Sequence, residues 1–278
     1  MASITDCVVE GLKYPFNDIK KLLGLGVLFA LISALSTYIS VKSFDIFRAA
    51  VHLAENTNVG VSHLSFSQLP TGDIYLVAGL GILAFIVSLF ILGYQYNIIK
   101  FSIERKEDLP GFSDVLGMFI NGIKYFLVIV AYNIIPSLVL VGGVALVGDS
   151  SAVIAISLVS ALLFIIANLL LLMALNNMVA HDSIKKAFDL HEIIGNISNL
   201  GWGKYVGIII FTVIVYMIIM VAVSFVLGFV TVGIAAISNQ AIIISFIIAI
   251  IEGLFVDSYG ALFYNRVCGS IYRESVNN

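Results

Sequence analysis

Long stretches without a charged side chain alternate along this chain with short polar connections. The longest stretch covers the 47 residues from Tyr205 to Ile251. A membrane hydrocarbon core about 30 Å thick needs roughly 20 apolar residues per helix, because an α-helix rises about 1.5 Å per residue. The longest stretch is therefore long enough for two spans, and its polar cluster Ser238-Asn239-Gln240 is predicted to form the turn between them. In all, the pattern predicts six transmembrane helices: Leu22–Val41, Ile74–Ile99, Tyr125–Gly148, Ser150–Ala180, Tyr205–Thr231 and Ala241–Tyr264.

The composition agrees with this pattern and argues against a water-soluble globule. The mean hydropathy is +1.09 and only 11% of the residues are charged, which leaves too little polar surface to cover a soluble fold. The predicted fold class is all-α, a polytopic membrane bundle of six transmembrane helices in three helical hairpins.

The basic residues are distributed unevenly among the connections. Twelve of the 14 lie in the termini or in even-numbered connections, and only Lys42 and Arg48 lie in an odd-numbered one. Because positively charged loops stay on the cytoplasmic side, the chain is predicted to be a cell-membrane protein with both termini in the cytoplasm. The net charge of −3 offers no basic field to nucleic acid, so no nucleic-acid partner is expected. Cys7 and Cys268 fall on the predicted cytoplasmic side, where thiols stay reduced.

The chain also shows signs of an internal repeat. The dipeptide Lys-Tyr occurs at Lys13-Tyr14, Lys124-Tyr125 and Lys204-Tyr205, each time at the approach to an odd-numbered span. The last two copies are 80 positions apart. We therefore expect a single integral membrane domain over residues 1–278, with repeats at about 1–106, 107–186 and 187–278.

Each repeat is predicted to begin with an amphipathic helix too short to cross a membrane. One such helix is predicted at Ile4–Leu12 and one at Phe112–Ile123. The third has the clearest apolar stripe, made of Ala187, Leu190, Ile193, Ile194 and Ile197. These helices are expected to lie in the headgroup plane, with Trp202 and the Lys-Tyr pairs as interfacial anchors. Alternatively, they are loop helices that pack on the bundle.

The first outer connection, about residues 42–73, is the only sizeable segment predicted outside the cytoplasm. Its first part, Phe44–Ala54, has the spacing to continue the first helix. A linker between spans is the expected role of the connection, and contact with a partner is the alternative.

Several short motifs stand out in the polar connections and at the span ends. They are Gly93-Tyr94, Leu109-Pro110-Gly111-Phe112-Ser113-Asp114, Asn121-Gly122-Ile123-Lys124, Pro136 and Ala187-Phe188-Asp189. Together they resemble an uncharacterised multi-pass membrane family, a domain of unknown function common in methanogenic archaea, over nearly the whole chain. That family usually has a second acid and a Trp where this chain has Ser113 and Val115. The resemblance implies an archaeal membrane protein without an assigned activity. The layout is also distantly similar to membrane domains attached to glycerophosphodiesterases.

Two acids lie inside the predicted sixth span, Glu252 near its middle and Asp257 five residues later. An ionised carboxylate at that depth costs at least about 2.5 kcal/mol, so each acid should be protonated, paired or beside a wet cavity. Five residues of α-helix rotate by about 500°, and on that geometry the two acids do not share a face. Both are candidates for an ion or substrate site, and the alternative is a hydrogen bond to another span.

Three asparagines occupy equivalent places at the predicted cytoplasmic ends of the even-numbered spans: Asn97, Asn177 and Asn265. If the repeats surround one axis, the amides form a ring that would bind an ion or a lipid headgroup. The favoured alternative is that each amide caps the end of its own helix.

Metal-capable side chains gather between the fourth and fifth spans, at His181, Asp182, Asp189, His191 and Glu192. The sequence has no pair of histidines four residues apart, which would direct two ligands to one metal. A solvated polar face is therefore expected here, and the sequence predicts no metal site and no cofactor.

These observations favour a non-enzymatic protein that acts in membrane organisation, lipid interaction or scaffolding. Its expected partners are membrane lipids, other membrane proteins or further copies of itself. The alternative is a small transporter or channel that uses Glu252 and the space between repeats. A third hypothesis is a membrane enzyme that acts on lipid. The sequence contains no clustered nucleophile, no set of metal-binding residues and no acid pair to support it.

Overall fold

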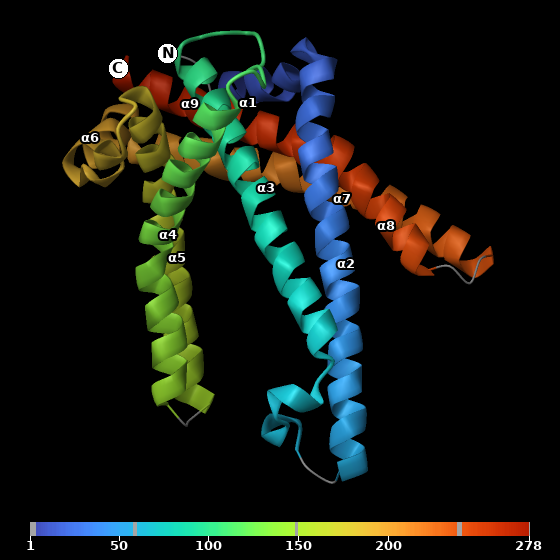
Figure 1. Cartoon of the computed structure of the whole chain (residues 1–278). Helices are drawn as coiled ribbons and strands as arrows, with labels where there is room; N and C mark the ends of the chain where they lie inside the picture. Colours follow the sequence, from blue (N-terminus) through green and yellow to red (C-terminus); the bar gives the residue numbers. More distant parts are fainter. Residues whose placement is uncertain (1–3, 58–59, 148–149, 238–240, 278) are drawn as a thin grey trace. The chain divides into compact units, whose positions relative to one another are not determined.

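The computed structural model describes residues 4–57, 60–147, 150–237 and 241–277, and all regular elements in these ranges are helical (Figure 1). Six of the helices are long and apolar enough to cross a membrane. The chain is therefore a multi-pass membrane protein, as its hydrophobic pattern predicted. The α-helices are α1 (Ile4–Lys13), α2 (Ile19–Thr57), α3 (Thr71–Ile103), α4 (Val115–Leu146), α5 (Ser150–Ala180), α6 (Leu190–Leu200), α7 (Trp202–Ile237), α8 (Ala241–Ile251) and α9 (Ser258–Val276).

Shorter helical elements connect or interrupt the long helices. Four are 3₁₀ turns, η1 (Tyr14–Asn17), η2 (Val61–His63), η3 (Phe66–Gln68) and η4 (Ile184–Phe188). The fifth, η5 (Glu252–Asp257), is a π-helix that joins α8 to α9 within the sixth span.

All six predicted spans are confirmed; α5 has the predicted bounds, and the other helices extend beyond the predicted bounds at one or both ends. The largest extension is at the end of α2, which reaches Thr57 and includes the amphipathic stretch Phe44–Ala54. The Lys42 ammonium group pairs with the Asp73 carboxylate at 3.3 Å, so α2 and the start of α3 are joined by an ion pair at that level. The turn predicted at residues 238–240 lies outside the described residues.

The amphipathic helix predicted at Phe112–Ile123 is not a separate element. The Asp114 carboxylate caps α4 by accepting a hydrogen bond from the Gly117 backbone N–H at 2.9 Å, and α4 then continues through the span to Leu146. The prediction was wrong because no proline separates the amphipathic stretch from the apolar one, and the turn-favouring pair Asn121-Gly122 is helical here. The predicted helices before the first and fifth spans are present as α1 and α6.

Two compact units make up the chain. Unit 1 combines residues 1–22, 92–218 and 259–278, and unit 2 combines residues 23–91 and 219–258. These boundaries do not follow the three predicted repeats. The single domain and its repeat limits therefore stay predictions.

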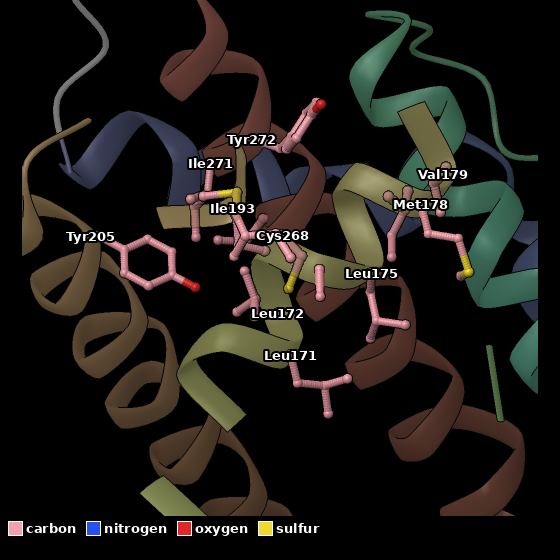
Figure 2. Packing of buried hydrophobic residues seen from close by; sticks show 14 of the residues in the cluster. Leu171, Leu172, Leu175, Met178, Val179, Ile193, Tyr205, Cys268, Ile271 and Tyr272 are labelled. Carbon is pink, nitrogen blue, oxygen red and sulfur yellow. The ribbon is translucent and has the colours of Figure 1, made fainter. Parts of the chain in front are cut away.

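The core of unit 1 is built largely from the last turns of α5, which pack against α6 and α9. Figure 2 shows Leu172 and Leu175 of α5 near Cys268 of α9, with Ile193 of α6 in the same cluster. The α6 helix thus presents one side to this core, where Ile193 and Ile197 are fully buried. Leu200 is also buried, whereas Leu190 and Ile194 are exposed.

Close helix contacts in both units require glycine. In unit 1 a Cβ at Gly93 of α3 would lie 1.8 Å from the Met118 backbone oxygen of α4. In unit 2 a Cβ at Gly26 of α2 would lie 2.2 Å from the Leu254 backbone oxygen, and one at Gly253 would lie 2.6 Å from the Ala30 backbone nitrogen. Small residues at such crossings let helix backbones pack directly against each other.

Candidate functional site

The motif residues around Gly93 form one packed junction between α3 and the segment before α4. The Tyr94 ring stacks on Phe112 with centroids 4.7 Å apart, and its hydroxyl donates to the Pro110 carbonyl at 2.9 Å. The Gly93 backbone lies directly against α4 beside this contact. These motif residues therefore have a structural explanation, which is to fix the entry of the third span.

The tyrosines of the three Lys-Tyr pairs are buried, so they are not interfacial anchors as predicted. Each hydroxyl donates to another segment of unit 1. Tyr14 bonds to the Asp108 carbonyl, Tyr125 to the Asn265 side chain and Tyr205 to the Leu169 carbonyl. Trp202 is 46% exposed and stays a candidate anchor.

A set of ion pairs, which we call the terminal clasp, joins α1 to α9 through Glu10, Arg266 and Arg273. The Glu10 carboxylate accepts from the Arg266 guanidinium at 2.7 Å and from the Arg273 guanidinium at 2.8 Å. Arg266 is only 4% exposed and also lies over the Tyr14 ring. Burial of Glu10 raises the pKa of its carboxyl, but the two arginines outweigh this effect and hold the pKa below its usual value.

The predicted polar cluster between α5 and α6 is engaged in ion pairs and a helix cap. The Asp182 carboxylate accepts from Lys124 at 3.1 Å and from the Tyr96 hydroxyl at 2.8 Å, and these bonds lower the pKa of the Asp182 carboxyl. Asp189 caps α6, and Glu192 pairs with Lys186. The described part of the chain contains no group of three metal-capable side chains.

The three predicted asparagines lie in unit 1, and two of them accept tyrosine hydroxyls. Asn177 accepts from Tyr272 at 2.9 Å, and Asn265 accepts from Tyr125 at 3.3 Å. The Asn177 amide donates to the Lys186 carbonyl, and the Asn265 amide donates to the carbonyl four residues earlier in its own helix. Neither side chain caps the end of its own helix. Asn97 is partly exposed and takes no part in these hydrogen bonds. The proposed ring of amides stays a prediction.

The two acids of the sixth span mark the ends of the π-helix η5. Because a π-helix bonds residue i to residue i+5, Glu252 and Asp257 lie one turn apart on the same face. The expectation that they point in different directions was wrong, since it assumed α-helical register throughout. Both side chains are partly exposed, and neither takes part in an ion pair with the rest of the described chain. Their role in ion or substrate binding stays a prediction.

A polar cavity of about 250 Å³ lies within unit 1 between α3, α4, α5 and α9. The Asn176 side chain on its wall is fully buried, and its amide donates to the Leu172 carbonyl at 2.8 Å. The Asn176 Oδ1 atom has no hydrogen-bond partner. Sequence reasoning selected the neighbouring Asn177 and missed this residue. The polar lining of the cavity is Gln95, Tyr125, Asn168, Asn176, Tyr264 and Cys268.

An apolar groove of about 330 Å³ lies on a different face of the α4–α5 hairpin. The Tyr132 ring stacks on Phe188 at its edge, with centroids 6.1 Å apart, and the Tyr132 hydroxyl donates to the Ala187 carbonyl. Pro136 lines the groove inside α4, where its ring nitrogen cannot donate a hydrogen bond to the carbonyl four residues earlier. The groove is otherwise lined by aliphatic side chains of α4, α5 and the start of α6.

Comparison with known proteins gives one match. A family model described as "Protein of unknown function (DUF4013)" matches residues 76–228, which are 153 of the 278 residues. No curated protein and no solved structure matches the chain. The matched range contains all of the apolar groove, whereas the terminal clasp and the two acids of η5 lie outside it. The archaeal origin and the likeness to glycerophosphodiesterase membrane domains stay predictions.

Proposed function

We propose that this chain, which belongs to the DUF4013 family of proteins of unknown function, is a non-enzymatic membrane protein that binds a lipid acyl chain in the apolar groove. Binding of lipid would place the protein among those that organise membranes or hold other proteins within them. Its partners would be membrane lipids and, through the same apolar surface, further membrane proteins or copies of itself.

The observation that carries this proposal is the groove itself, which is concave, apolar and located on membrane-spanning helices. Its one hydroxyl, on Tyr132, is already bonded to the Ala187 carbonyl. An occupant would therefore meet only hydrocarbon and aromatic surface. Because the bilayer core is itself apolar, van der Waals packing in the concave groove would hold the occupant, and an acyl chain is the apolar molecule most abundant at this depth.

The surroundings of the groove favour a lipid over a soluble ligand. Phe188, at the end of η4, and Leu190, at the start of α6, are each 50% exposed and line the groove. Ile194, one turn further along α6, is also exposed. An apolar strip beside a charged segment that includes Lys185 suits the boundary between acyl chains and headgroups.

The test compares two substitutions of alanine on α5. Ala167 lines the groove, so Ala167→Phe should fill it and reduce the retained phospholipid several-fold. Ala161 is exposed on the same helix outside the groove, so Ala161→Phe should leave lipid retention unchanged. Native mass spectrometry of protein released from lipid nanodiscs measures the bound lipid. Equal retention by the two variants would overturn the lipid proposal.

A small transporter or channel is the second candidate function. It is favoured by the π-helix, because π turns inside α-helices often occur at functional sites and this one places two acids on the same face. Glu252 would be the central residue of the pathway. We also propose, from the distribution of basic residues, that the protein lies in the cell membrane with both termini in the cytoplasm.

A further inference from the structure

We propose that the polar cavity of unit 1 binds a neutral, hydroxyl-bearing molecule or headgroup of about the size of glycerol. This site differs from the apolar groove, and its occupant differs from the acyl chain proposed there. The proposal therefore stands or falls independently of the lipid function.

The cavity wall contains an unpaired hydrogen-bond acceptor. Asn176 is fully buried, and its Oδ1 atom has no hydrogen-bond partner. A buried polar atom of this kind costs free energy unless a partner reaches it. Because the atom is an amide oxygen, the partner must be a hydrogen-bond donor.

A second amide on the same helix, that of Asn168, also lines the cavity. Asn168 lies eight residues before Asn176, which corresponds to about 12 Å along α5. Its two N–H groups donate to the Phe164 carbonyl and to the Asn133 side-chain oxygen, at 2.8 and 3.2 Å. Only the Asn168 oxygen is left for a ligand. The separation between the two amides exceeds the reach of one glycerol-sized molecule, so a ligand bonded to the Asn176 Oδ1 atom would not also reach the Asn168 oxygen.

Size and charge narrow the ligand class further. The lining contains no Lys, Arg, Asp or Glu, so a full charge in the cavity would have no counter-ion. A volume of about 250 Å³ corresponds to roughly eight waters at about 30 Å³ each. That space is too large for a bare ion and suits a small polyol. The Leu and Ile side chains between the amides would contact its carbon atoms.

The cavity is accessible at one side. Asn168 and Tyr264 both line it and are exposed, whereas Asn176 lies at its buried end. A hydroxylated molecule could enter as a free polyol, or as the headgroup of a lipid such as phosphatidylglycerol. The chemistry at Asn176 is the same in both cases, and the experiment distinguishes the two sources.

The experiment measures both sources with one variant and one control. Asn176→Leu keeps the shape of the side chain and removes the acceptor, while Asn196→Leu removes a buried amide on α6 that does not line the cavity. Saturation-transfer NMR with glycerol tests the free polyol. Native mass spectrometry from nanodiscs, with phosphatidylglycerol against phosphatidylethanolamine, tests the headgroup. Asn176→Leu should weaken one of these bindings at least tenfold, and Asn196→Leu should change neither.

A second variant covers the case in which Asn176→Leu does not fold. Ile129 of α4 lines the cavity without bonding to either amide, so Ile129→Phe should occupy the space and abolish binding. Loss of glycerol binding identifies a free polyol, and loss of phosphatidylglycerol preference identifies a headgroup. If folded wild type binds neither probe, or if folded variants bind as the wild type does, the site assignment is wrong. Changes at Ala167 in the apolar groove should leave both readouts unchanged, which separates this result from the lipid test.

Discussion

One carboxylate, Glu10, holds two arginines that are far away in the sequence. Arg266 is almost completely buried, so its charge depends on the hydrogen bonds that it donates to Glu10 and to the Lys106 carbonyl. Removing one partner of a buried ion pair leaves the other charge without compensation. The resulting loss of stability is larger than the net contribution of the intact pair. The Glu10 side chain itself is 30% exposed, which reduces the effect but does not remove it.

Glu10→Gln should destabilise the protein by about 3 kcal/mol, because it leaves the buried Arg266 without its anion. The matched control is Glu55→Gln, whose pair with His52 is exposed and should contribute less than about 1 kcal/mol. Denaturant unfolding in detergent micelles measures both changes. A Glu10→Gln variant as stable as Glu55→Gln would contradict a structural role for the clasp.

The same carboxylate predicts a dependence of stability on pH. Folding lowers the pKa of Glu10 below its ordinary value of 4.5, so its stabilisation is complete above that pH. The stabilisation should decrease as the pH falls from 4.5 through the lower pKa of the folded protein. The free energy of unfolding, measured between pH 7 and pH 3, should decrease less in Glu10→Gln than in the wild type.

At the residue level, the sequence identified side-chain types better than it identified their surroundings. The motif residues Tyr94 and Asp114 were recognised, and each has a defined contact. The sequence could not separate Asn176 from Asn177, because adjacent residues on a helix differ in direction by about 100° and only the packing of other helices decides which is satisfied. The tyrosines of the Lys-Tyr pairs were predicted at the membrane interface, whereas the packing of other helices buries them.

At the level of elements, hydrophobic length predicted the spans because the thickness of the membrane sets it. The π-helix was not predictable in this way, since one wider turn does not change the hydrophobic pattern. Its position depends on contacts made after folding, including the close approach of Gly253 to the α2 backbone at Ala30. The register of Glu252 and Asp257 therefore had to come from the structure.

The η5 element allows the transport candidate to be tested. Glu252→Gln retains the shape of the side chain and removes its titratable proton, so proton- or cation-coupled flux in proteoliposomes should fall at least tenfold if the acid pair forms a pathway. Asp257→Asn should have a similar effect because it lies one π turn away on the same face. Exposed Glu55→Gln serves as the control. Wild-type flux in both η5 variants, across a panel of cations and a pH gradient, would reject this pathway.

For the whole molecule, the distribution of basic residues predicts which connections share a side of the membrane. Cysteines introduced at Lys106 and Lys185 should be labelled by an impermeant maleimide only from the cytoplasm, and one at Ser62 only from outside. All three positions are exposed. Labelling of 106 and 185 from opposite sides would contradict the six-span topology.

The two native cysteines should not disturb this labelling. Cys7 is 2% exposed, and burial, followed by nearby Glu274 and Glu10, raises the pKa of its thiol to about 11. Cys268 is also buried. The unmodified protein is therefore expected to give no signal until it is denatured, which provides the background control.

The terminal clasp also has a consequence for biosynthesis. Glu10 and Arg266 are 256 positions apart, and a ribosome that adds about 5–20 residues per second needs roughly 10–50 s to make the chain between them. During that interval α1 has neither its arginine partners nor the α9 surface at Phe263 and Val267 that lies against Gly11. Helix α1 would therefore wait at the membrane surface, available to chaperones or lipids, until α9 has been inserted.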